Sequence, residues 1–283
     1  MTENAALQNM GESIALVSPN AEISASTHGG RAKCLQRLVR LDLPVPTTVA
    51  LSFDCVSRIA AGETVDVVKL LEPFGNDPLL CVRPSSEDPD WGGPGAILNI
   101  GMNDATYVTL CDRIGKEAAT RLYLRFVQSY AIHVARLDPD MFDNIAPDEG
   151  TQSLKDALRA YEDETDEEFP QDTSQQLREV LRSMARAWNG TTARLLRQAK
   201  GAPADAGLGL VVQRLALGVG TGESGSGVVQ LVNGKTGEAK LTGRYQRQSQ
   251  GREALTAGAK ALYLAKDARG QSLEDTVPEA FER

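Results

Sequence analysis

The sequence predicts an α+β protein in which a mixed first part is followed by a helical segment and a β-rich last part. Three observations carry this prediction. Short β-branched and apolar runs occur before residue 103 and again after residue 207, as is typical of strands. Between residues 104 and 200 the apolar residues instead recur at helical spacing. Near the end, the turn at residues 233–237 (NGKTG) separates two apolar runs and indicates a hairpin.

In the first part, Gly29-Gly30 is expected to open a helix that ends at residues 43–46 (LPVP), because proline disfavours helix in the residue before it. Strands are expected at Thr47–Ser52 and Leu79–Arg83, with a short helix at Phe53–Ala61 between them. Residues 1–26 show only weak periodicity. They are therefore expected to form a loosely ordered lead-in.

The middle segment is expected to contain helices capped by side chains. Asp104 stands at the start of one helical pattern. Thr173 with Gln176 three residues later resembles a capping box. The helix that follows is expected to stop at Asn189-Gly190 and to bury one apolar face, made of Leu177, Val180, Leu181, Met184 and Trp188.

In the last part, Leu208–Leu217 is predicted to form a buried strand and is followed by the glycine-rich run Gly218–Gly227. Hairpin strands are expected at residues 228–232 and 238–242. The chain is accordingly divided into a lead-in (1–26), a first subdomain (27–103), a helical insert (104–200) and a β-rich second subdomain (201–283).

The composition of the chain indicates which kinds of binding partner and which cellular compartment to expect. The net charge is −8 and the pI about 5.0, and a surface of that sign repels nucleic acid and anionic membranes, so neither is an expected partner. The four cysteines are widely spaced, which favours reduced thiols over disulfides or a zinc site. Met1–Glu12 has no basic, apolar leader pattern, and we expect a cytoplasmic protein.

Two cations stand where an anion could be bound. Arg83 is expected at the end of a buried strand, ahead of a mobile loop at Pro84–Gly95, and a guanidinium offers a planar fork of donors to a phosphate. Arg31 follows Gly29-Gly30 at the expected helix start, where backbone N–H groups and the helix dipole favour an anion. Taken alone, a structural role is the commoner outcome for each arginine. The acids of the 84–95 loop are expected to be solvated, with Mg²⁺ binding as the alternative.

The glycine-rich run has the composition of a phosphate-covering loop. Glycine lets the backbone approach a phosphate closely and present its N–H groups, although a merely flexible loop is the commoner outcome. The stretch that would cover the phosphates contains Gly220, Gly222, Ser224, Gly225 and Gly227.

Four motifs together resemble the N-terminal nucleotide-binding domain of the pyruvate phosphate dikinase and phosphoenolpyruvate synthase family, over about residues 27 to 260. They are residues 29–46 (family GGKGANL and LPVP), 82–104 (family VRS and LNLGLND), 211–238 (family NVQAMVFG and a glycine turn) and 243–258 (family GEYLINAQGEDVVAG). The resemblance implies an ATP-grasp-like fold with a nucleotide cleft between two β-containing subdomains. It would place the strands at Leu79–Arg83 and Leu208–Leu217 on opposite walls of that cleft.

The resemblance also implies which residues hold ATP. Residue by residue, it gives Arg31, Arg83, Gln213, Gly220, Gly222, Ser224, Gly225, Gly227, Arg244 and Gln250. It gives no catalytic residue. Arg31 stands where the family has lysine, and Arg244 stands where the family has an acid that binds Mg²⁺. Because arginine cannot coordinate a metal, we name no metal ligand, and the use of Mg²⁺ stays open.

Two functions from different classes are kept. The first is a stand-alone, divergent ATP-binding relative of the dikinase nucleotide domain that phosphorylates a histidine on a separate protein. The second is a degenerate, non-catalytic nucleotide sensor or protein-interaction module, which Arg244 favours. A scaffold that binds no nucleotide is a third interpretation. Arg83 and the glycine-rich run favour the first.

Overall fold

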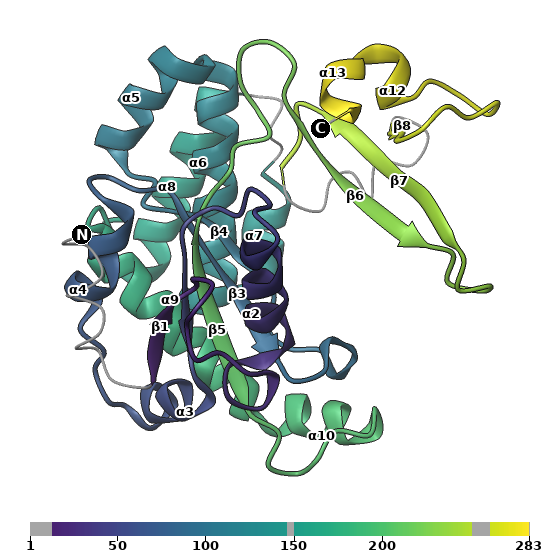
Figure 1. Cartoon of the computed structure of the whole chain (residues 1–283). Coiled ribbons are helices and arrows are strands. Elements are labelled where there is room, and N and C mark those ends of the chain that lie inside the picture. Colours follow the sequence, from purple (N-terminus) through teal and green to yellow (C-terminus); the bar gives the residue numbers. More distant parts are fainter. Residues whose placement is uncertain (1–12, 146–149, 251–260, 283) are drawn as a thin grey trace. The chain divides into compact units, whose positions relative to one another are not determined.

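The computed structural model describes residues 13–145, 150–250 and 261–282 (Figure 1). The chain forms two compact units. The first unit comprises Met1–Val108 and Thr120–Leu215, and the second comprises Thr109–Ala119 and Ala216–Arg283. No helix among the described residues has the length and apolar character that a membrane crossing requires. Each unit is built around an antiparallel sheet.

The first unit holds a five-stranded sheet in the order β1-β2-β5-β3-β4. Every neighbouring pair in it is antiparallel. Its strands are β1 (Ile14–Leu16), β2 (Thr48–Leu51), β3 (Leu80–Ser86), β4 (Ile97–Ile100) and β5 (Leu208–Arg214). The edge strand β1 lies inside the expected lead-in, so residues 14–16 are regular structure, while residues 1–12 of that lead-in lie outside the described residues.

The expected placement of two strands on opposite walls of a cleft is wrong. Strands β3 and β5 are hydrogen-bonded neighbours, paired from Leu80 with Arg214 through to Ser86 with Leu208. Strand β5 also pairs with β2 and therefore lies at the centre of the sheet. It ends at Arg214 rather than at Leu217, and β3 continues three residues past Arg83. The apolar runs of β3 and β5 are therefore buried side by side in the same sheet.

Helix α2 (Ala25–Arg40) covers one face of this sheet. It begins earlier than expected, because Ser24 Oγ accepts a hydrogen bond from Thr27 N at 3.1 Å and caps the helix there. Gly29 itself is non-helical and separates a short first turn from the longer helix, which opens at Gly30 where the sequence predicts a helix start. Val211 of β5 joins the apolar cluster under the helix, together with Val17, Ile23, Ala32 and Ala50.

The other face of the sheet carries residues that alternate with Val211, such as Leu210 and Val212, both fully buried. Helices α3 (Phe53–Ala61) and α9 (Thr173–Asn189) pack against each other and contact β5. Helix α3 has the predicted bounds and ends at Gly62 in a left-handed cap. The short elements that follow are α4 (Val67–Leu71), η1 (Glu72–Phe74) and, after β3, η2 (Pro89–Trp91).

The prediction that residues 104–200 are mostly helical is confirmed. Their described elements are α5 (Asp104–Ile114), α6 (Lys116–Tyr130), the π-helical turn η3 (Ala131–Ala135), α7 (Pro139–Asp143), α8 (Thr151–Thr165), α9 and α10 (Thr191–Ala199). An aromatic cluster packs between α6, α8 and the start of α9, and its rings are Tyr123, Phe126, Tyr130, Tyr161 and Phe169. Burial and the hydrogen bond to Glu179 raise the pKa of Tyr130, so this phenol stays neutral.

The apolar face predicted for α9 is buried, and the helix ends at Asn189 before Gly190, as predicted. The expected capping box is wrong. Asp172 caps α9 by accepting from Ser174 N at 2.8 Å. Gln176 is fully buried and serves the end of β4 instead: its Oε1 accepts from Gly101 N at 2.8 Å and its Nε2 donates to Met102 O at 3.0 Å.

The second unit holds a three-stranded sheet in the order β6-β7-β8, made of β6 (Gly225–Val232), β7 (Ala239–Arg247) and β8 (Leu262–Tyr263). The predicted hairpin is confirmed, with Asn233 N donating to Glu238 O at 2.8 Å across its turn. The unit ends with the short helices α12 (Leu273–Thr276) and α13 (Pro278–Phe281).

Candidate nucleotide site

The Gly29-Gly30 turn rests directly on the last residues of β3. Gly29 has φ 85° and ψ 164°, a backbone conformation that essentially only glycine adopts. A Cβ at Gly29 would lie 1.8 Å from the carbonyl oxygen of Ser85. Ser85 Oγ donates to His28 O at 2.7 Å and accepts from Ala32 N at 3.1 Å. The expectation of an open set of helix N–H groups at this turn is therefore corrected, because a serine of β3 takes one of them.

Arg31 and Arg83 lie close together beside this turn. Arg31 Nε donates to Pro84 O at 2.7 Å, which ties the α2 side chain to β3. Arg83 is half-buried on β3, and no hydrogen bond or ion pair among the described residues engages its guanidinium. Both charges reach Cys81: burial raises the pKa of that thiol to about 11, while Arg83 and Arg31 lower it. Arg31, which is bonded to Pro84 O, therefore lies near Arg83, whose guanidinium donors are engaged by no other described residue.

Gln213 lies on the same face of the sheet as Arg83. It is directly opposite Cys81 in the β3–β5 pair, and side chains two residues apart on a strand share a face. Its Nε2 donates to Thr48 Oγ1 at 2.8 Å, so the amide is held in a fixed orientation. The structure therefore brings Arg31, Arg83 and Gln213 to the α2-covered face of one sheet, and these three residues are called the arginine face.

The glycine-rich run belongs to the second unit, where two glutamines hold it. Gln250 Oε1 accepts from Gly218 N at 2.8 Å. Gln248 Oε1 accepts from Gly220 N at 2.9 Å, and its Nε2 donates to Gly222 O at 2.9 Å. The run is thus fixed by the residues that follow β7. Sequence reasoning missed Gln248, which lies in a turn directly after β7 with φ 48°.

Not every glycine of the run is free to serve a ligand. A Cβ at Gly225 would lie 2.4 Å from Gln246 O, and one at Gly227 would lie 2.7 Å from Arg244 O. These two glycines belong to β6 and allow close pairing with β7. Gly222 has φ 79° with no other atom within 4 Å of its would-be Cβ, so it shapes the tip of the turn next to Ser224.

Arg244 is held inside the second unit. Its Nη2 donates to Ala261 O at 2.6 Å, and its guanidinium carbon lies 4.3 Å from the centre of the Tyr263 ring. Arg269 approaches the same ring at 4.9 Å. Tyr263 was not anticipated from sequence, because the pairing of β8 with β7 joins residues far apart in the chain. Residues 251–258 of the fourth motif lie outside the described residues.

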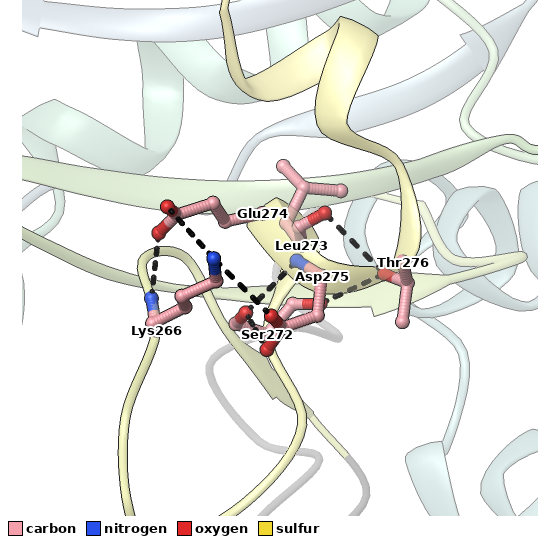
Figure 2. Close-up of polar contacts among 6 residues, drawn as sticks. All are labelled: Lys266, Ser272, Leu273, Glu274, Asp275 and Thr276. Atoms are coloured by element: carbon pink, nitrogen blue, oxygen red, sulfur yellow. Dashed lines mark hydrogen bonds and ion pairs between the residues drawn. The ribbon is translucent and has the colours of Figure 1, made fainter.

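A cluster of polar contacts at the start of α12 fixes the segment that follows Tyr263 (Figure 2). Ser272 Oγ donates to Asp275 Oδ2 at 2.6 Å and accepts from Asp275 N at 3.1 Å. The backbone N of Lys266 donates to Glu274 Oε2 at 2.9 Å. Tyr263 N donates to Gln271 O at 2.9 Å, so the cluster supports the strand on which Arg244 stacks.

The described residues do not fit a protein-built metal site. No group of three His, Cys, Asp or Glu side chains gathers anywhere in ranges 13–145, 150–250 and 261–282. At the position where the resemblance expects an acid, Arg244 is engaged by a carbonyl and a ring. A cavity of about 1330 Å³ is lined by residues 13–28 and 52–54, but Arg31, Arg83 and Gln213 are not part of that lining.

The chain described above, with its mixed α/β fold and antiparallel sheets, has a sequence similar to those of several pyruvate, phosphate dikinases. The chain is 27% identical to the pyruvate, phosphate dikinase of Rhizobium meliloti (strain 1021) over 89% of its length. It is 26% identical to the enzyme of Clostridium symbiosum over 90% of its length. It is 24% identical to pyruvate, phosphate dikinase 2 of Oryza sativa subsp. japonica over 89%. No protein-family model matches the chain.

These similarities support a domain related to part of pyruvate, phosphate dikinase. The chain spans about a third of the length of the curated relatives it matches, with 33%, 33% and 32% of the three proteins covered. About nine tenths of the chain is aligned, so the similarity extends over most of both units.

Proposed function

We propose that this chain binds ATP through the arginine face of its first unit. The observation that carries the proposal is Arg83, a half-buried guanidinium without a protein partner among the described residues, set beside Arg31 and Gln213. An arginine in that state retains a fork of donors that matches phosphate oxygens. The relatives' similarity to the chain supports a nucleotide of the ATP type.

The roles follow from the chemistry of each group. Arg31 and Arg83 would neutralise phosphate charge on a chain whose net charge is −8. Gln213 would offer its fixed amide to a polar group of the nucleotide. In this proposal the fold is of the ATP-grasp type.

The proposal extends to transfer of a phosphoryl group to a histidine on a separate protein, which is the activity the resemblance implies. Such transfer depends on cations that neutralise charge between the phosphates. The described residues do not fit a metal ligand at Arg244, so we derive no transfer step through Mg²⁺. We also place the protein in the cytoplasm, in line with its reduced-thiol composition.

A second function, a nucleotide sensor without catalysis, is favoured by one observation. Arg244 is stacked on Tyr263 and bonded to Ala261 O, which gives it a structural role in the second unit. A side chain that holds a sheet together is a poor substitute for a metal-binding acid. The two functions share ATP binding and differ in whether Mg²⁺ is required.

Thermal unfolding with ATP tests both functions at once. We expect ATP to raise the Tm in Mg²⁺ and to raise it by a similar amount in EDTA, because arginines rather than a metal neutralise the phosphates. At an ATP concentration about 100 times Kd, binding adds about 2.7 kcal/mol to the free energy of unfolding. Adenosine, which lacks phosphates, is the control and is expected to leave the Tm nearly unchanged.

The Arg244→Glu variant separates the two functions. It introduces an oxygen ligand, so its ATP-induced shift should become larger in Mg²⁺ than in EDTA. A shift that strictly requires Mg²⁺ in the natural protein would contradict the sensor and return the chain to the kinases. If ATP left the Tm unchanged both in Mg²⁺ and in EDTA, nucleotide binding would be excluded, and the remaining interpretation would be a scaffold that binds no nucleotide.

A further inference from the structure

A second cavity lies between α3, α9, α10 and the start of β5, and it shares Phe53 and Asp54 with the lining of the larger cavity. Its volume is about 500 Å³, within the range of cavities that hold small organic ligands. Phe53, Trp188 and Leu208 contribute apolar lining, and Arg194 and Arg197 contribute two cations. Neither Arg31, Arg83 nor Gln213 lines it, so it is separate from the arginine face.

Arg197 forms a fixed cationic wall of this cavity. Its side chain is 6% exposed, and its guanidinium carbon lies 3.6 Å from the centre of the Trp188 ring. Nη1 donates to Trp188 O at 2.7 Å, and the indole Nε1 donates to Ala206 O at 2.9 Å. The ring and the cation are thus positioned before any ligand arrives. A guanidinium has five N–H donors, and the carbonyl takes one of them.

No carboxylate neutralises the two arginines. None of the ion pairs among the described residues includes Arg194 or Arg197. Burial and the nearby charge of Arg194 both lower the pKa of Arg197, as expected for an unpaired buried cation. Two acids also line the cavity: Asp54 is paired with Arg58 at 3.2 Å, and Asp205 is exposed.

We propose that this cavity binds a small organic acid, in which a carboxylate is attached to an aromatic or branched apolar body. The carboxylate accepts hydrogen bonds from Arg197 and Arg194, and the apolar body packs against Phe53 and Trp188. A buried cation without a carboxylate partner is expensive, and an anionic ligand relieves that cost. An apolar wall of this size requires a ligand with a body larger than inorganic phosphate.

The test uses the fluorescence of Trp188. The chain has two tryptophans, Trp91 and Trp188, so a Trp91→Phe background leaves Trp188 as the reporter. Titration with phenylacetate is expected to change the emission with a saturable curve, whereas phenylacetamide and inorganic phosphate are expected to give none. Arg194→Gln, an exposed substitution that should not impair folding, is expected to weaken phenylacetate roughly tenfold, the loss typical of one charge-assisted hydrogen bond.

Two further variants sharpen the result. Asp205→Asn removes a rim carboxylate and is expected to strengthen binding, and Arg186→Gln, an exposed arginine of α9 outside the cavity lining, is expected to leave it unchanged. Saturating ATP should not displace phenylacetate. Equal responses to the acid and the amide, unchanged affinity in Arg194→Gln, or competition by ATP would each overturn the proposal. The first two outcomes leave ATP binding at Arg83 unaffected, whereas competition by ATP would place the nucleotide at this cavity.

Discussion

Replacing Arg83 with alanine is expected to abolish most of the ATP-induced rise in Tm. The guanidinium has no described protein partner, so its removal costs the folded protein little while depriving a phosphate of its strongest donors. A hydrogen bond to a charged group contributes about 1.5–3 kcal/mol, so ATP affinity should fall roughly tenfold to a hundredfold. Calorimetric titration of both proteins with ATP measures this loss, and urea unfolding without ATP measures the small change in stability.

Arg186→Ala serves as the matched control, because Arg186 is an exposed arginine on α9. It changes the net charge by the same amount as Arg83→Ala and should leave ATP affinity nearly intact. Equal affinities for Arg83→Ala and the natural protein would remove Arg83 from the nucleotide site. Equal losses in both variants would mean that net charge, rather than the arginine face, attracts ATP.

Replacing Gly29 with alanine is expected to destabilise the protein strongly, although it adds only one methyl group. The new Cβ would lie 1.8 Å from Ser85 O and would sit on a backbone with φ 85°. Because the obstacle is a β3 carbonyl rather than a flexible side chain, the turn must lift off the sheet. The combined clash and strain should lower the free energy of unfolding by about 3 kcal/mol or more, seen as a lower urea midpoint.

Gly95→Ala is the control for that substitution. Gly95 has no positive φ and no atom within 4 Å of its would-be Cβ, so the added methyl meets open space. Its urea midpoint should stay close to that of the natural protein. A Gly29→Ala protein with an unchanged midpoint would contradict the close approach of the turn to β3.

Local elements of the fold could be predicted from the sequence, whereas strand pairing could not. Helix α3 and the β6–β7 hairpin depend on residues close in the chain, and their signals are periodicity and turn chemistry. The neighbours β3 and β5 are separated by the entire helical segment, and two apolar runs carry no information about which strand each will meet. Placing them on opposite walls was therefore an error of topology.

The roles of individual side chains show the same contrast between local patterns, which the sequence reveals, and long-range contacts, which it does not. Thr173 and Gln176 have the spacing of a capping box, but Gln176 is buried and its amide serves Gly101 and Met102, so a tertiary demand overrides a local pattern. Similarly, Asn103, rather than Asp104, caps α5 by accepting from Thr106 N at 2.8 Å. The candidate residues came from the resemblance; the structure adds Ser85, Gln248 and Tyr263, which hold the turn, the glycine-rich run and Arg244.

Hydrogen exchange measured by mass spectrometry, with and without ATP, tests the central claim most directly. If ATP is held by the arginine face, peptides covering residues 27–33 and 81–87 should exchange more slowly with ATP bound. Peptides from α8 (Thr151–Thr165), which carries none of the candidate residues, should exchange at the same rate in both samples. Protection confined to other segments, with residues 27–33 and 81–87 unchanged under saturating ATP, would contradict the account.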